Sequence, residues 1–156
     1  MRPMALASGC AIVLASVGFA VAGDPQPQAA PQDPQFVELA FRAAVTAWAY
    51  NEYWRLYGMG TKDSRAALSE KDFVVQMEQG WRRPGIGVEI VDVHIRGVHA
   101  VIRAKLRMEY GRYTRERIGS WPFQTGPTDE MVQSVLLYEE GEWRVNLYQL
   151  VGMARY

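Results

Sequence analysis

The clearest pattern in the chain is an alternation of apolar and polar side chains over residues 98–110. Successive side chains of a β-strand point to opposite faces of the sheet, so this period of two predicts a strand with one face in the core. The expected inward positions are Val98, Ala100, Ile102, Ala104, Leu106, Met108 and Tyr110.

A second alternating run, at about 88–95, predicts the partner strand of a hairpin, with Arg96 and Gly97 as a two-residue turn. This register gives one wholly apolar face, with the pairs Ile95–Val98, Val93–Ala100 and Val91–Ile102. The opposite face has the pairs His94–His99, Asp92–Val101 and Ile90–Arg103.

Two further strands are predicted at about 131–139 and 142–151, with Glu140 and Gly141 as the turn between them. The alternation places one set of side chains on the same face: Val132, Ser134, Leu136, Tyr138, Trp143, Val145, Leu147 and Gln149. The four strands together indicate an antiparallel sheet built from hairpins.

The first part of the domain has the period of a helix. Asp33 is suited to cap a helix and Pro34 to begin one, and the apolar positions that follow are spaced by four and three residues. We predict one long helix that ends near Gly58 or Gly60. Its expected core stripe is Phe36, Ala40, Ala43, Ala47, Tyr50, Trp54 and Tyr57.

Two shorter helical segments follow. Thr61–Leu68 is expected to form a short helical turn. Ser69 begins a sequence that resembles a capping box, with Asp72 in place of the usual glutamate, and it predicts a helix that runs to Gly80. Residues 84–87, Pro-Gly-Ile-Gly, are expected to turn the chain into the sheet.

The segment between the two hairpins has a weaker pattern. A short strand is expected at 113–118, and two prolines and two glycines predict a long loop at 119–128. Trp121 and Phe123 in that loop are large apolar residues, which suggests either a lid over the mouth of the domain or a contact surface.

The N-terminal region has the layout of an export signal. A charged start at Arg2 is followed by an uncharged stretch that ends in Ala20-Val21-Ala22. We predict a signal peptide at 1–22 with cleavage after Ala22, a Pro/Gln-rich tether at 23–35 and a single domain at 36–156. A retained membrane anchor is the less favoured alternative, because Ala, Gly and Ser dilute the apolar stretch.

Cysteine content agrees with a periplasmic or secreted protein. Cys10 lies before most of the apolar stretch, so its surroundings do not form a lipid-attachment box. The mature chain then contains no cysteine for a disulfide or a thiol nucleophile. The 17 basic and 17 acidic residues cancel, which argues against a nucleic-acid binder. After cleavage we expect no association with the membrane.

A long helix, shorter helices and an antiparallel sheet define an α+β fold. In this order the chain resembles the superfamily of nuclear transport factor two-like and SnoaL-like domains. The resemblance covers about 36–151 and rests on Ala47-Trp48 to Tyr57, Asp63 to Phe73, the hairpin around Gly97 and Gly141-Glu142-Trp143-Arg144-Val145. It implies a curved sheet that wraps the helices into a cystatin-like cone.

The same resemblance implies a cavity inside the cone, where enzymes of the superfamily hold Asp, His or Tyr. The strand positions expected to face inward offer only Tyr110, Ser134, Tyr138 and Gln149. We therefore name no catalytic residue. With the aromatic end of the helix, the expected pocket is Tyr50, Trp54, Tyr57, Tyr110, Ser134, Tyr138 and Gln149.

The face of the sheet that is expected to lie outside carries two sets of polar side chains. His94, His99 and Asp92 are too few and too poorly convergent for a zinc site, so no metal is expected. Arg103, Lys105 and Arg107 are either a solvated face or, with Trp121 and Phe123, an interaction surface. The latter allows an acidic partner or a homodimer through the sheet.

The sequence favours an exported, non-catalytic accessory domain that binds a partner protein or a small apolar ligand. The alternative is a SnoaL-like isomerase, dehydratase or hydrolase that acts on an apolar substrate in the periplasm. No glycine-rich phosphate loop, serine elbow or metal-spaced cluster is found, so no cofactor is expected. A carboxylate or histidine that reaches a cavity would favour the enzyme.

Overall fold

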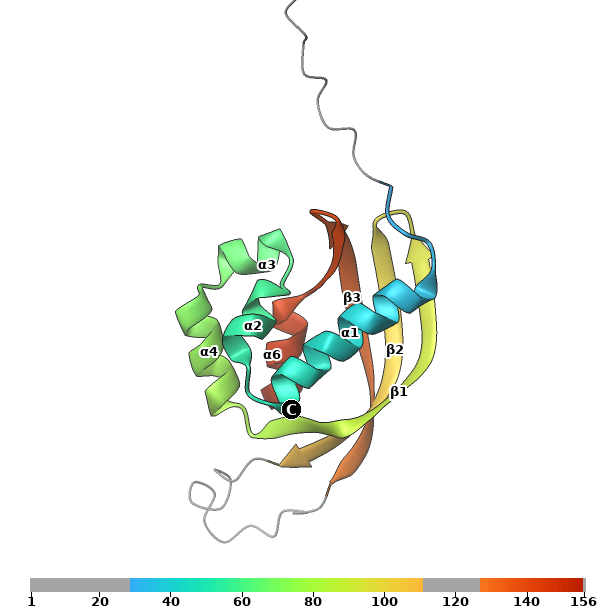
Figure 1. Ribbon diagram of the computed structural model, residues 1–156. Helices are drawn as coiled ribbons and strands as arrows, with labels where there is room; N and C mark the ends of the chain where they lie inside the picture. The colour runs from blue at the N-terminus through green and yellow to red at the C-terminus, as the bar shows by residue number, and fades with distance from the viewer. Residues whose placement is uncertain (1–28, 111–126, 156) are drawn as a thin grey trace, which may run out of the picture.

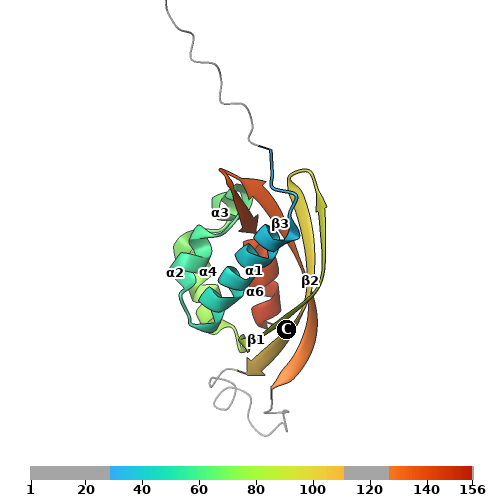
Figure 2. The same cartoon turned by 45° about the vertical axis from the view of Figure 1, so that its right-hand side comes forward.

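The computed structural model describes residues 29–110 and 127–155, which form helices packed on one face of a four-stranded antiparallel sheet (Figure 1). The sheet order is β1-β2-β3-β4, and the sheet curves around α1 and α6 (Figure 2). The elements are α1 (Pro34–Ala49), α2 (Tyr53–Gly58), α3 (Lys62–Ala67), α4 (Glu70–Gln79), β1 (Arg82–Arg96), β2 (His99–Tyr110), β3 (Thr128–Glu139), β4 (Glu142–Val145) and α6 (Leu147–Arg155). The predicted α+β class is confirmed.

The single helix predicted through Tyr57 is wrong, because the chain breaks after Ala49. Helix α1 begins as expected, with the Asp33 side chain accepting a hydrogen bond from the Gln35 N–H. Asn51 then takes a φ of 61°, in the left-handed region that asparagine tolerates better than most residues. The chain restarts in another direction as α2.

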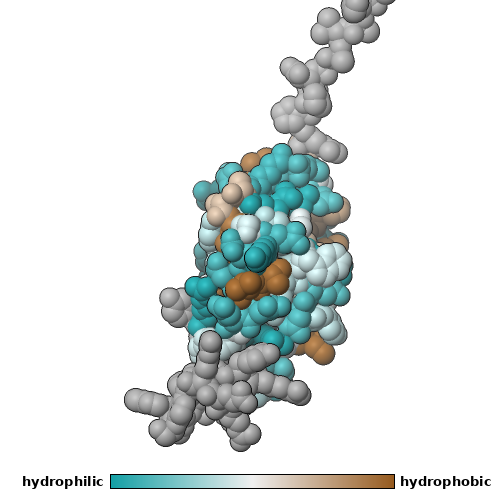
Figure 3. Space-filling model, turned by 90° about the vertical axis from the view of Figure 1, so that its left-hand side faces the viewer, coloured by the Kyte–Doolittle hydropathy of each residue, from teal (hydrophilic) through white to brown (hydrophobic). Residues whose placement is uncertain are grey.

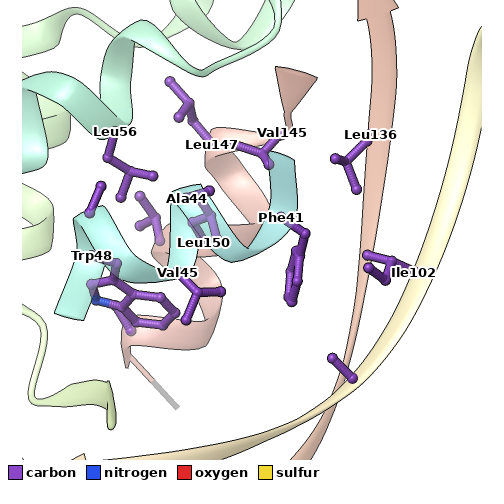
Figure 4. Packing of buried hydrophobic residues seen from close by; sticks show 14 of the residues in the cluster. Phe41, Ala44, Val45, Trp48, Leu56, Ile102, Leu136, Val145, Leu147 and Leu150 are labelled. Carbon is purple, nitrogen blue, oxygen red and sulfur yellow. The ribbon is translucent and has the colours of Figure 1, made fainter. Parts of the chain in front are cut away.

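The face of α1 that is buried also differs from the prediction. The buried side chains are Val37, Phe41, Ala44, Val45, Ala47 and Trp48. Phe41 points from α1 toward Ile102 and Leu136 of the sheet, whereas Trp48 lies near Leu56 of α2 (Figure 4). Of the predicted stripe, Phe36 is 51% exposed and Tyr50 is 63% exposed. Two apolar stripes run along α1, and the sheet covers the one that was not predicted.

The short helices agree with their sequence signals. The Thr61 hydroxyl accepts from the Ser64 N–H at the start of α3. The Ser69 hydroxyl accepts from the Asp72 N–H at 3.2 Å at the start of α4, as a capping box requires. Helix α4 ends at Gln79, next to the predicted Gly80.

The β1–β2 hairpin turns one residue later than predicted, at Gly97 and Val98. Gly97 has a φ of 60°, which favours glycine there. The predicted pairs are therefore wrong. For residues 92–95 each partner moves by two positions, so these four residues stay on their predicted faces. The observed pairs are Arg96–His99, Ile95–Ala100, His94–Val101, Val93–Ile102 and Asp92–Arg103.

Strand β1 contains irregularities that its sequence pattern did not reveal. The register shifts between Ile90 and Asp92, so Ile90 packs against the core while Val91 is 51% exposed. The predicted orientation of these two residues is wrong because a bulge inserts an extra residue. The strand also begins earlier, at Arg82, and includes the segment at 84–87 that was predicted as a turn.

The turn at Glu140 and Gly141 is confirmed, with φ values of 55° and 85°. The predicted strand over 142–151 is correct only as far as Val145. Asn146 then accepts hydrogen bonds from the N–H groups of Tyr148 and Gln149 and so caps α6. Leu147 fits an apolar period of two and an apolar helical stripe equally well. The sequence pattern therefore predicted a strand where the structure has the start of α6.

The strand predicted at 113–118 and the part of the loop that contains Trp121 and Phe123 lie outside the described residues. Among the described helices, none is long and apolar enough to span a membrane.

Two phenylalanines on opposite sides of α1 test this packing. Phe41→Ala removes a fully buried ring and is expected to lower the free energy of unfolding by about 3–5 kcal/mol. Phe36→Ala, on the exposed side, should cost about 1 kcal/mol or less. Urea unfolding followed by circular dichroism measures both. Equal costs for the two variants would contradict the observed rotation of α1.

Candidate functional site

An apolar groove lies between α1 and the β3–β4 hairpin. Its volume is about 370 Å³. One wall is the second apolar stripe of α1, and the other is formed by the hairpin and Met59. The lining residues are Pro31, Phe36, Ala40, Ala43, Met59, Tyr138, Gly141, Glu142, Trp143 and Val145.

The width of the groove follows from the small residues of its helical wall. Phe36, Ala40 and Ala43 follow one another at helical spacings of four and three, so they share one side of α1. The two alanines leave space where longer side chains would fill it. Opposite them, the rings of Tyr138 and Trp143 meet edge to face, with centroids 5.4 Å apart.

The groove contains little polar chemistry. Glu142 is exposed and pairs with Arg144 at 3.3 Å, so its charge is matched by a neighbour on the same strand. The indole N–H of Trp143 is buried and has no hydrogen-bond partner among the described residues. An unpaired buried donor costs about 1–3 kcal/mol, so it is an unusual feature in this wall.

A group of ion pairs holds the hairpin turn against α3. Glu140 lies 3.2 Å from Lys62, 3.6 Å from Arg65 and 3.4 Å from Arg144. Glu139 also accepts a hydrogen bond from the backbone N–H of Lys62 at 2.8 Å. Because Tyr138 and Trp143 flank this turn, the same contacts fix the hairpin wall of the groove.

The edge of β4 gives a second anchor to that wall. The Val145 N–H donates to the Met59 carbonyl, and the Thr61 N–H donates to the Val145 carbonyl, both at 3.0 Å. Gly60 therefore forms a parallel bridge with Val145. This bridge places Met59 at one side of the groove.

The seven residues of the predicted pocket do not share one cavity in the described part of the chain. Tyr50 and Trp54 are 63% and 67% exposed. The Tyr57 hydroxyl donates to the Arg65 carbonyl at 2.9 Å, and its ring contacts Phe73. Of the six whose side chains are described, Tyr138 alone lines the groove. The side chain of Tyr110 lies outside the description.

The remaining two predicted pocket residues do come together, inside the structure. Ser134 is fully buried, and its hydroxyl lies 3.4 Å from the Gln149 amide oxygen. The same oxygen accepts from the Val135 N–H at 2.8 Å. Strand β4 pairs with β3 only from Leu136 onward, and the Gln149 side chain accepts the hydrogen bond of the next residue, Val135. The role of Gln149 is therefore structural.

The predicted basic surface has mixed charge in the structure. Arg103 pairs with Asp92 at 3.1 Å, and Lys105 pairs with Asp129 at 3.0 Å. The hydrogen bond to Asp129 raises the pKa of Lys105. Arg107 shares a shallow hollow of about 330 Å³ with acidic Glu89 and Asp129. The other two members of this predicted surface, Trp121 and Phe123, lie outside the described residues.

His94 and Asp92 lie close together, with Nε2 and Oδ2 2.9 Å apart, but Asp92 also pairs with Arg103. No group of three or more His, Cys, Asp or Glu side chains suited to a metal is found within residues 29–110 and 127–155.

A second cavity lies on the other side of the hairpin and was not predicted. It has a volume of about 410 Å³, and its apolar part includes Val135 and Leu137 of β3. The polar lining comes from separate elements: Thr61, Asp63 and Ser64 at α3, His99 on β2, Asn146, and Tyr148 on α6. His99 is exposed, and it lines this cavity together with residues of α3 and α6.

The alanines of the groove were recognised in the sequence but assigned to the core. Tyr138 of the opposite wall was predicted as a pocket residue, but opposite the aromatic end of the helix and not opposite the alanines. The sequence did contain one sign of the groove. Residues 34–49 carry two apolar stripes, and only one stripe of a helix can face the sheet. Met59 and Trp143 join the groove through tertiary contacts that no local pattern encodes.

This arrangement defines an α+β domain with a four-stranded antiparallel sheet and an open apolar groove. No family model matches the chain, and no curated protein is found that resembles it. The solution structure of a SEC-C motif-containing protein from Rhodopseudomonas palustris is similar, with a TM-score of 0.50 and 13% sequence identity. The match covers 70% of this chain and 73% of that chain. At this identity the similarity concerns the fold alone.

The ion pairs at the hairpin turn predict a pH effect. Lys62, through its hydrogen bond and charge, holds the pKa of Glu140 below its usual value, and Arg144 and Arg65 act in the same direction. A lowered folded-state pKa means that the unfolded chain binds the proton more readily. The stabilisation is therefore present above the unfolded pKa of about 4.3 and is lost as the pH falls through the folded value.

Lys62→Met is expected to raise the pKa of Glu140 toward its usual value, as measured by NMR titration of the side-chain carboxyl. Arg55→Met, which removes a cation that pairs with Glu52 instead, serves as the control and should leave that pKa unchanged. An unchanged pKa in Lys62→Met would show that the ion pair does not persist in solution.

Proposed function

We propose that this protein is a non-catalytic binding domain that holds an apolar group in the groove between α1 and the β3–β4 hairpin. The group is an apolar side chain of a protein or a small apolar molecule. The observation that carries the proposal is the exposed apolar stripe of α1, which faces aromatic side chains across an open space of about 370 Å³. Sites of this size and composition are typical of apolar ligands.

The charges near the groove also favour binding over catalysis. Among the described residues, Glu142 is the one carboxylate that lines the groove, and it is exposed and paired with Arg144. Burial raises the pKa of Tyr53, but this phenol lies outside the groove and donates to Asn51. An acid or base tuned for proton transfer is normally found within reach of the substrate.

We also propose where in the cell this domain acts. The leader at 1–22 supports export, so the domain would act in the periplasm or outside the cell. The curved antiparallel sheet with helices on its inner side supports membership of the nuclear transport factor two-like superfamily. In that arrangement α1 fills the inside of the cone, and the groove lies beside it.

A fluorescent probe tests the groove directly. N-phenyl-1-naphthylamine emits strongly in apolar sites, and we expect it to bind the wild-type protein. Ala43→Phe should weaken this binding at least tenfold, because the added ring would occupy the groove. Ala66→Phe is the matched control, since Ala66 is an exposed residue of α3 and does not line the groove.

Thermal unfolding by circular dichroism would verify that both variants fold. Equal affinity of the probe for Ala43→Phe and the wild type would show that the groove is not the binding site.

The second candidate function is a SnoaL-like isomerase, dehydratase or hydrolase that acts on an apolar substrate in the periplasm. The observation in its favour is the second cavity, where Asp63, His99 and Tyr148 line one space above apolar β3 side chains. A histidine and a carboxylate there could share acid and base roles.

If the protein is a hydrolase, it should hydrolyse an apolar test ester such as p-nitrophenyl butyrate. His99→Ala should reduce its hydrolysis at least a hundredfold, the usual contribution of a general acid or base. His94→Ala, which changes an exposed histidine outside that cavity, should not. Hydrolysis that survives His99→Ala would remove the support for catalysis in this cavity.

A further inference from the structure

The second cavity, of about 410 Å³, combines apolar surface with polar side chains from separate elements. Val135 and Leu137 of β3 supply half-buried apolar side chains. Asp63 of α3, His99 of β2 and Tyr148 of α6 supply the polar ones. The side of the molecule that carries α3 is mostly hydrophilic, with hydrophobic atoms in small groups (Figure 3). A ligand in this cavity would therefore contact one apolar surface with polar groups around it.

The polar side chains of the cavity are not used to hold the fold together. The side chains of Asp63, His99 and Tyr148 form no hydrogen bond or ion pair with any residue among 29–110 and 127–155. Lys62 lies next to Asp63 in the chain but pairs with Glu140 instead, at 3.2 Å. Three polar side chains that line one space without internal partners are available to a ligand.

The hydrogen-bonding capacities of these groups favour a neutral, hydroxylated ligand over an ion. The Asp63 carboxylate only accepts, whereas the Tyr148 hydroxyl and a neutral His99 ring both donate and accept. The Asn146 side-chain oxygen accepts from the N–H groups of Tyr148 and Gln149, so its amide nitrogen remains as a donor. Asp63 would repel an anion, and a cation would offer no acceptor to Asn146. A hydroxyl group serves both kinds of partner.

The aromatic ring narrows the class of ligand further. Tyr148 is 50% exposed, so its ring offers apolar area at a polar site. A pyranose ring has C–H groups on its faces and hydroxyls around its rim. It therefore matches an aromatic ring and apolar β3 side chains that are bordered by donors and acceptors. The cavity volume lies near the lower end of the range for small-molecule sites, about 300–1,000 Å³.

We propose that this cavity binds the ring of a neutral pyranose sugar. Tyr148 stacks on a C–H face of the sugar, and Asp63, His99 and Asn146 form hydrogen bonds with its hydroxyls. The lining residues of this cavity and of the apolar groove do not overlap, so the inference does not rest on the groove as a binding site. It also gives the cavity a different ligand from the apolar substrate of the second candidate function.

Two-dimensional ¹H–¹⁵N NMR of the exported protein tests the proposal by titration with D-glucose, D-galactose and N-acetyl-D-glucosamine. We expect at least one of these sugars to shift the amide signals of Asp63, His99 and Tyr148, with a dissociation constant in the millimolar range. The signals of Ala43 and Trp143, which belong to the groove and its walls, should stay in place.

Variants of the aromatic ring and the histidine test the proposed contacts. Tyr148→Ala should weaken sugar binding at least tenfold, whereas Tyr148→Phe, which keeps the ring, should retain the affinity to within about fivefold. Tyr50→Ala is the matched control, because Tyr50 is 63% exposed and does not line the cavity. His99→Ala should weaken binding severalfold, and His94→Ala should not. Circular dichroism would verify that each variant folds.

The absence of these shifts with all three sugars would overturn the proposal, as would equal affinity of Tyr148→Ala and the wild type. Tetramethylammonium is the counter-probe, because an aromatic ring and a carboxylate can also bind a cation. Tighter binding of this ion than of any sugar would replace the proposed ligand class. An apolar ester that shifts the same signals when no sugar does would favour the second candidate function instead. Binding of N-phenyl-1-naphthylamine in the groove is measured separately, so failure of one site does not imply failure of the other.

Discussion

The packing of α1 into the curve of the sheet is the constraint on which the other features depend. Phe41 faces Ile102 and Leu136, while Trp48 lies near Leu56 of the second helix (Figure 4). All five side chains are fully buried. Loss of a ring of this kind costs several kcal/mol, a large part of the total stability of a small domain. The rotation of α1 is therefore fixed, and with it the side that faces the groove.

Local chemistry predicted much of this fold. The caps at Asp33 and Ser69 and the turn at Glu140-Gly141 were found from the sequence because each depends on neighbouring residues. The α1 stripe, the bulge at Val91 and the start of α6 were not. In each case the same residues fit two arrangements, and only contacts with distant residues decide between them. A stripe with Phe36 and a stripe with Phe41 fit a period of 3.6 equally well.

The candidate site was harder to predict than the fold, for a related reason. Ala40 and Ala43 form a groove only because the β3–β4 hairpin lies opposite them. The hairpin is held there by ion pairs around Glu140 and by the bridge of Val145 to Gly60. Apart from the local Glu140–Arg144 pair, these contacts join residues far apart in the chain, as the Lys62–Glu139 hydrogen bond does with a separation of 77. No pattern within a single strand or helix carries such information. The predicted pocket failed because Tyr50, Trp54 and Tyr57 were assigned to the same helix as the alanines, whereas α1 ends at Ala49 and Trp54 and Tyr57 lie in α2.

An exposed apolar groove has a consequence for how such a domain could work. Apolar surface exposed to water favours any association that covers it, and the association with the highest product of affinity and concentration prevails. An apolar ligand or an apolar side chain of a partner protein would cover the alanine-lined space. Its binding would need no conformational change in the core. The rigid packing of Phe41 and Trp48 is compatible with this behaviour, since the groove is formed by the side of α1 that the core does not use.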